Sequence, residues 1–73
     1  MNEQEQHNRD KQFMIECLTD SLIQMLMEDY GYDIQTAMHK LYTSTTYKKL
    51  ENENTGLYYQ GAVYIYEMLK NEL

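Results

Sequence analysis

The sequence contains no proline and no tryptophan, and only one cysteine, one phenylalanine and three glycines among its 73 residues. A single cysteine excludes a disulfide within the chain, so we expect a reducing, cytoplasmic environment. Cys17 falls on the apolar side of an expected helix. We interpret it as a buried free thiol that packs as a small hydrophobic residue.

The motifs that hold cofactors or metals are also missing. The three glycines are isolated, so they cannot form a phosphate-binding loop, and the sequence has no CxxC, HExxH or calcium-binding pattern. The candidates for catalysis, Cys17 and His39, belong to different expected helices. We therefore predict no enzymatic activity, no cofactor and no metal site. A small hydrolase or transferase that uses Cys17 or His39 is the alternative.

Long hydrophobic runs are absent as well. The first twelve residues, MNEQEQHNRDKQ, are polar and lack the apolar centre of a secretory signal. The apolar stretches further along are broken by charges and are shorter than the roughly 20 residues that cross a bilayer. We expect a soluble, cytoplasmic protein without a membrane segment.

Positive charge is scarce. Six basic residues stand against twelve acidic ones, which gives a formal net charge of −6. Binding to a nucleic-acid backbone requires a concentrated positive surface, so nucleic acid is an unlikely partner. The alternative is a small nucleic-acid-associated regulator that uses the only local cluster, Lys40, Lys48 and Lys49. The acidic balance fits simple solubility, or docking onto a basic protein.

Residues 13–27, FMIECLTDSLIQMLM, carry the densest run of large apolar side chains and predict a central first helix over residues 10–29. The apolar arc of this helix is wide enough to need cover from more than one direction, and its main face consists of Ile15, Leu18, Leu22, Met25 and Leu26. Gly31 is suited to end this helix and Asp33 to cap the next. That second helix is predicted over residues 34–42, with five side chains facing inward: Ile34, Ala37, Met38, Leu41 and Tyr42.

The hydroxyl run at residues 43–46 predicts a short third helix over residues 46–52, with Ser44 or Thr45 as its cap. We expect residues 57–59 to be briefly extended and residues 62–71 to form a last helix. Its inward side chains are predicted to be Ala62, Val63, Ile65, Tyr66 and Leu69. A strand over residues 57–66 is the alternative, because this segment is rich in β-branched and aromatic residues.

These elements predict an all-α fold: a small bundle of three to four short helices around a long, central first helix. Residues 1–11 are a polar N-terminal extension, either disordered or forming solvated first turns of that helix. Residues 12–73 are then a single helical domain.

Tyrosine and methionine are in excess, with eight and six copies. A chain of this length buries only about 60% of its unfolded surface, so its core is small. The tyrosines either close that core with their hydroxyls in water or form a protein-binding face. We predict a non-catalytic protein-interaction module, which is a homodimer or an antitoxin-like or adaptor subunit that binds a protein partner. The predicted binding face consists of Met14, Met27, Tyr58, Tyr59, Tyr64 and Met68.

The C-terminal part of the chain, residues 41–73, carries the pattern LYxSxTY, then TGLY, then YxYxxL. The pattern resembles the C-terminal half of a family of short, uncharacterised bacterial proteins. The matching residues are Leu41, Tyr42, Ser44, Thr46, Tyr47, Thr55, Gly56, Leu57, Tyr58, Tyr64, Tyr66 and Leu69. Gly61 stands where a proline or a polar cap is expected. The resemblance implies an all-helical domain without enzyme activity, among small proteins encoded beside toxin-like partners.

Overall fold

The computed structural model describes residues 3–73, with side chains described for residues 11–52 and 54–73. It contains four α-helices: α1 (Glu3–Tyr30), α2 (Ile34–Tyr42), α3 (Thr45–Glu51) and α4 (Ala62–Lys70). Two single 3₁₀ turns, η1 (Glu53–Thr55) and η2 (Leu57–Tyr59), connect α3 to α4. No strand occurs between residues 3 and 73. The predicted all-α class is confirmed.

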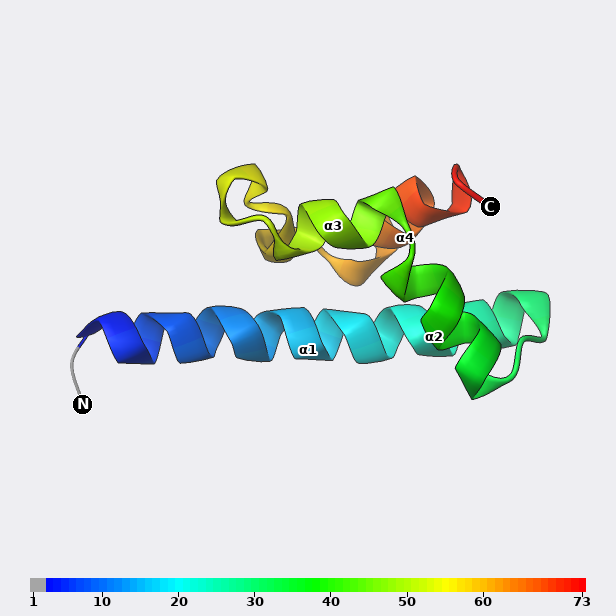
Figure 1. Ribbon diagram of the computed structural model, residues 1–73, viewed down its shortest axis with the longest axis horizontal. Coiled ribbons are helices and arrows are strands. Elements are labelled where there is room, and N and C mark those ends of the chain that lie inside the picture. Colours follow the sequence, from blue (N-terminus) through cyan, green and yellow to red (C-terminus); the bar gives the residue numbers. More distant parts are fainter. Residues whose placement is uncertain (1–2) are drawn as a thin grey trace.

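The long helix α1 is the base on which the other elements are arranged (Figure 1). It contacts α2, η2 and α4, while α3 contacts α2, η2 and α4. The longest dimension of the molecule is 43 Å, close to the roughly 42 Å expected of 28 helical residues at 1.5 Å each. The prediction of a central first helix with the second and last helices packed against it is therefore confirmed.

The N-terminal polar segment was predicted as an extension over residues 1–11. In the structure α1 already begins at Glu3, so residues 3–11 continue the helix. Residues 1 and 2 lie outside the described residues. Within residues 3–73, no helix is long and apolar enough to cross a membrane.

Local sequence signals set the turn between α1 and α2. Gly31 has a φ of +70°, and its N–H donates to the carbonyl of Met27 at 3.0 Å. Asp33 caps α2 because its carboxylate accepts from the N–H of Thr36 at 2.8 Å. Hydrogen bonding from the Thr36 side chain, together with that from its backbone N–H, holds the pKa of Asp33 below its ordinary value. Both predicted roles are confirmed, since a glycine tolerates the left-handed backbone and an aspartate satisfies a free helical N–H.

The core draws side chains from all four helices. Leu22 and Leu26 of α1 are fully buried, and five further side chains share that state: Ala37, Leu41, Leu50, Ile65 and Leu69. Ile15, Leu18 and Met25 pack against this cluster while remaining partly exposed. The predicted inner face of α1 is thus confirmed. Truncating a core leucine to alanine typically costs about 2–5 kcal/mol, so each of these side chains is a large fraction of the stability of so short a chain.

Several sequence predictions about exposure and local conformation are wrong. Cys17 is exposed rather than buried, because it lies on the side of α1 that no other helix covers. Val63, predicted to face inward, is 67% exposed on the outer side of α4. Residues 57–59 form a 3₁₀ turn instead of an extended piece, and the alternative strand over residues 57–66 is excluded because α4 begins at Ala62.

The N-terminus of α3 is capped from two directions. Ser44 caps it as predicted, since its hydroxyl accepts from the N–H of Tyr47 at 3.0 Å. The carboxylate of Glu72, beyond the end of α4, accepts from the backbone N–H groups of Thr45 and Thr46, both at 2.7 Å, and from the Thr46 hydroxyl. Partial burial raises the pKa of Glu72, but the hydrogen bonds from Thr46 and Thr45 outweigh this effect and hold the pKa below its ordinary value. The C-terminal segment is thereby attached to the start of α3.

We expect Glu72→Ala to lower the free energy of unfolding by about 1 kcal/mol, the usual cost of losing a helix cap. The folded-state pKa of Glu72 lies below the unfolded one. Its contribution is therefore present above the unfolded-state pKa and lost as the pH falls through the folded-state pKa. Urea denaturation at neutral and acidic pH measures both effects. Glu67→Ala removes an exposed pair with Lys70 and serves as the control, with a change below about 0.5 kcal/mol. Equal effects of the two substitutions contradict the capping role.

Candidate protein-interaction surfaces

The eight tyrosines divide between the core and the surface. Tyr58 and Tyr66 are buried, Tyr32 and Tyr47 are partly buried, and the other four are exposed: Tyr30, Tyr42, Tyr59 and Tyr64. Half of the rings therefore remain in contact with water, as expected for a chain too short to enclose them. Neighbouring rings pack in pairs, with Tyr42 and Tyr47 edge to face at 5.0 Å between centroids.

The structure places the six residues of the predicted binding face in different surroundings. Met14 and Met68 are partly buried against the core, and Tyr58 is buried within it. Tyr59 and Tyr64 are well exposed, on η2 and α4. Met27 lies apart from these, in a groove between α1 and α2. The six residues therefore do not share one surface. Most of the exposed large apolar side chains belong instead to two parts of the structure, η2 with α4 and α1 with α2, while Phe13, Tyr30 and Leu73 lie outside both.

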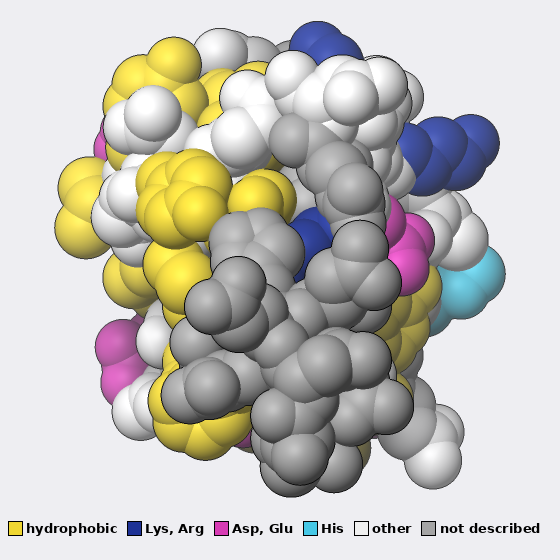
Figure 2. All heavy atoms as spheres, turned by 90° about the vertical axis from the view of Figure 1, so that its left-hand side faces the viewer, with side chains coloured by type: hydrophobic (Ala, Val, Ile, Leu, Met, Phe, Trp, Pro, Cys, Tyr) yellow, Lys and Arg dark blue, Asp and Glu magenta, His cyan; other side chains and the backbone are white. Residues whose placement is uncertain are grey.

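The first surface, here called the tyrosine face, consists of Tyr59, Val63 and Tyr64. These side chains are 64%, 67% and 56% exposed. The ring of Tyr59 packs on the buried ring of Tyr58, with centroids 4.4 Å apart, which fixes its position. Figure 2 shows hydrophobic side chains gathered mainly on the left of that view, with lysine side chains at the top, centre and right and a histidine side chain at the right. The tyrosine face is a fixed apolar surface of the kind that is enriched in protein interfaces.

The charge next to the tyrosine face is locally balanced. Glu67 lies on the same exposed side of α4 as Val63, and its carboxylate pairs with the ammonium of Lys70 at 3.1 Å. The ammonium of Lys70 also lies 5.3 Å from the centre of the Tyr66 ring. This surface therefore carries little of the negative charge that the rest of the chain has in excess.

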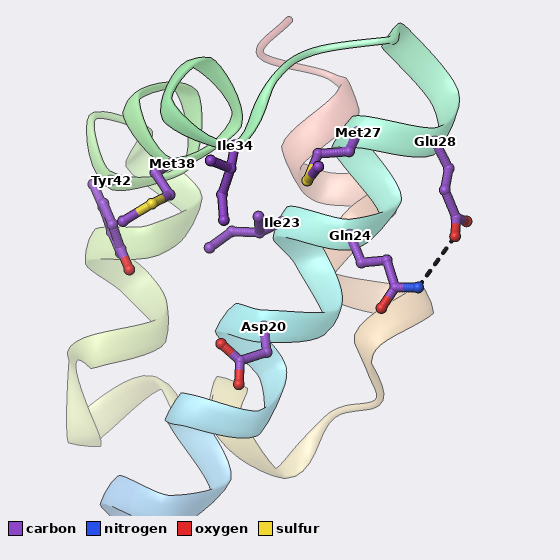
Figure 3. A pocket seen from close by; sticks show the side chains of 8 residues that line it. All are labelled: Asp20, Ile23, Gln24, Met27, Glu28, Ile34, Met38 and Tyr42. Carbon is purple, nitrogen blue, oxygen red and sulfur yellow. Dashed lines mark hydrogen bonds between the residues drawn. The ribbon is translucent and has the colours of Figure 1, made fainter.

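The second surface is the groove between α1 and α2, with a volume of about 720 Å³. Ile23 and Met27 of α1 point toward Ile34 of α2, as Figure 3 shows. Three of the lining side chains are considerably exposed, with values of 37% for Met27, 55% for Ile34 and 42% for Tyr42. The full lining is Asp20, Ile23, Gln24, Met27, Glu28, Ile34, Met38 and Tyr42.

The polar lining of this groove comes from α1 alone. Asp20, Gln24 and Glu28 recur every four residues and so follow one edge of the helix. The Gln24 amide donates to the Glu28 carboxylate at 3.2 Å, the contact drawn as a dashed line in Figure 3. Among the residues whose side chains are described, neither Asp20 nor Glu28 pairs with a cation. The groove therefore has an apolar floor and an acidic edge.

Ile34 and Tyr42 were expected to face inward, and their exposure in the groove was missed. A signal for it is present in the sequence. On α2 the apolar residues form two adjacent stripes, one at Ala37 and Leu41 and the other at Ile34, Met38 and Tyr42. α2 buries only one of these stripes fully, the one formed by Ala37 and Leu41.

The other candidate groups do not assemble into a site. Lys40, Lys48 and Lys49 lie in the last turns of α2 and α3, where a cation interacts favourably with the helix dipole. Cys17 and His39 are both exposed, and no hydrogen bond joins them. Across the described residues, no group of three histidine, cysteine or carboxylate side chains could hold a metal ion. The nucleic-acid and enzyme alternatives gain no support from this geometry.

Tyr66 connects α4 to the C-terminal end of α1 and thereby holds the tyrosine face in place. Its hydroxyl donates to the Asp29 carboxylate at 2.7 Å and lies 3.3 Å from the carbonyl oxygen of Met25. Burial, together with the hydrogen bond to Asp29, raises the pKa of Tyr66 well above its ordinary value. A buried hydroxyl with a partner this far along the chain is a tertiary anchor rather than a reactive group.

The chain matches no protein-family model, no curated protein and no solved structure. The resemblance drawn from residues 41–73 accordingly stays a prediction.

We expect Tyr66→Phe to lower the free energy of unfolding by about 1 kcal/mol, the net value of one hydrogen bond. The pKa of Tyr66 is higher in the folded than in the unfolded state. The hydroxyl therefore stabilises the fold fully below the unfolded-state pKa, and this contribution is lost as the pH rises through the folded-state pKa. Denaturation curves at neutral and alkaline pH measure it, with Tyr30→Phe as the control, since Tyr30 is exposed and belongs to neither candidate surface. If the Tyr66 and Tyr30 variants behave alike, the anchoring role is refuted.

Proposed function

We propose that this chain is a non-catalytic, cytoplasmic protein-interaction module that forms a homodimer through the tyrosine face. The observation that supports it best is the exposure of Tyr59, Val63 and Tyr64, each more than half accessible on a fixed surface. Large exposed apolar patches are uncommon on monomeric proteins and mark interaction sites. Tyrosine also suits an interface because its ring is rigid and its hydroxyl still finds a partner there.

The charge distribution supports a second copy as the occupant of this surface. Two chains of net charge −6 repel each other, so they associate most easily where that charge is weakest. Glu67 is paired with Lys70 beside the tyrosine face, which leaves the contact region nearly neutral. A twofold arrangement places the same patch on both subunits, and a neutral apolar patch is complementary to itself.

Formation of a dimer would also stabilise a chain whose own core is small. Among the described side chains the core has eleven buried apolar members, and the single cysteine of the sequence excludes a disulfide within the chain. Association with another subunit is the usual remedy for a small domain. The exposed thiol of Cys17 is compatible with a reducing compartment, because an exposed cysteine elsewhere is prone to oxidation.

The double substitution Val63→Gln and Tyr64→Gln is expected to convert the dimer to a monomer or to raise its dissociation constant at least about tenfold, as for interface residues that contribute more than 1 kcal/mol. Sedimentation equilibrium over a range of protein concentrations measures this constant. Phe13→Gln is the matched control, since Phe13 is 66% exposed but lies on α1.

Two results would reject the proposal. One is a wild-type chain that remains monomeric at high concentration. The other is a dimer whose dissociation constant is unchanged by the double substitution while circular dichroism shows both variants folded.

A further inference from the structure

We propose that the groove between α1 and α2 binds a basic amphipathic helix of a protein partner. The groove is distinct from the tyrosine face, because its lining comes from α1 and α2 whereas the tyrosine face lies on η2 and α4. The inference therefore does not depend on dimer formation. It assigns the chain a second surface and a partner of defined chemistry.

The apolar floor provides the hydrophobic part of the recognition. Ile23 is buried at the bottom, and Met27, Ile34 and Tyr42 extend over it with much of their surface exposed. Two of the lining residues, Met27 and Met38, have unbranched side chains that adjust to the shape of a partner. A groove of about 720 Å³ with such a lining suits the apolar face of a helix better than a small polar ligand.

The length of the groove matches a short helix. Asp20 and Glu28 are eight residues apart on α1, which corresponds to about 12 Å along the helix axis. Ile34 and Tyr42 are separated by the same number of residues on α2. Two walls of this length accept about two turns of a partner helix, which present apolar side chains at positions i, i+3 or i+4, and i+7.

The acidic edge selects the charge of the partner. Asp20 and Glu28 both belong to the α1 wall of the groove, and neither pairs with a cation among the described side chains. Lys40 lies on the side of α2 opposite to Ile34, Met38 and Tyr42, given 100° of rotation per residue. A lysine or arginine on the flank of the partner helix would therefore meet an unpaired carboxylate.

The same charges disfavour other occupants. A nucleic acid or an anionic membrane surface would be repelled by Asp20 and Glu28 together with the net charge of −6. A second copy of this chain carries Glu16, Asp20 and Glu28 along its own long helix, so it brings like charge to the acidic edge. A basic amphipathic helix brings apolar side chains to the apolar floor and positive charge to the acidic edge.

The test uses two synthetic fluorescent peptides of the same length and the same apolar i, i+3, i+4, i+7 pattern. One carries lysines on its flanks and the other carries glutamates. Fluorescence anisotropy with the full chain is expected to show saturable binding of the basic peptide and binding at least about tenfold weaker for the acidic one. The affinity for the basic peptide should fall as salt rises from about 50 to about 500 mM, since exposed charges are screened.

Four variants locate the binding site. Ile34→Gln is expected to weaken binding of the basic peptide at least about tenfold, as a central apolar contact. The pair Asp20→Asn and Glu28→Gln should weaken binding and flatten its salt dependence. Glu51→Gln with Glu67→Gln removes the same amount of charge elsewhere and should leave the site intact, as should Val63→Gln with Tyr64→Gln on the tyrosine face.

Several outcomes would overturn the inference: no binding of the basic peptide by the folded chain, equal binding of both peptides, or no effect of Ile34→Gln. A loss of self-association in Ile34→Gln without peptide would show instead that a second copy covers the groove. Failure of the groove leaves the tyrosine-face dimer untouched, because sedimentation of the Val63 and Tyr64 variants reports on that dimer alone.

Discussion

The structure depends on how three short helices cover the apolar surface of one long helix, α1. The apolar arc of α1 is too wide for a single neighbour, and α2, η2 and α4 approach it from different directions. Leu22 and Leu26 lie where these elements meet and are fully enclosed. None of the covering helices exceeds nine residues, so each buries only one narrow stripe and leaves its second stripe in water. The two candidate surfaces are what remains after this incomplete covering.

Two polar anchors hold the short helices at their places. Tyr66 attaches α4 to Asp29 at the end of α1, and Glu72 attaches the segment after α4 to the first turn of α3. Each connects residues more than twenty positions apart. Hydrophobic contact alone is not directional, whereas a hydrogen bond fixes the position of a helix along and around its neighbour. The positions of Val63 and Tyr64 on α4 depend on these anchors.

The local elements were predictable from the sequence. The contacts that end α1 at Gly31 and cap α2 at Asp33 and α3 at Ser44 all join residues no more than four positions apart. The helical spacing of apolar residues that predicts α1 is likewise a local signal. The outward direction of Val63, Ile34 and Cys17 was not predictable in the same way. It depends on which side of a helix another helix covers, and that is decided by contacts between residues far apart in sequence. The pairing of Glu72 with Thr45 and Thr46 likewise has no local signal.

The Glu72 contact gives the second half of the chain an unusual connectivity. From Thr45 the backbone runs through α3, both 3₁₀ turns and α4, and at Glu72 it returns to the point of departure. The segment is thus a ring closed by a carboxylate, while α1 and α2 form a hairpin with a three-residue connection of its own. Thermal fluctuations in such a molecule divide along that boundary. Release of the carboxylate opens this ring at Thr45 and Glu72 while Tyr66 still holds α4 on α1, so amide protons in the first turn of α3 and in the segment after α4 should exchange with solvent together.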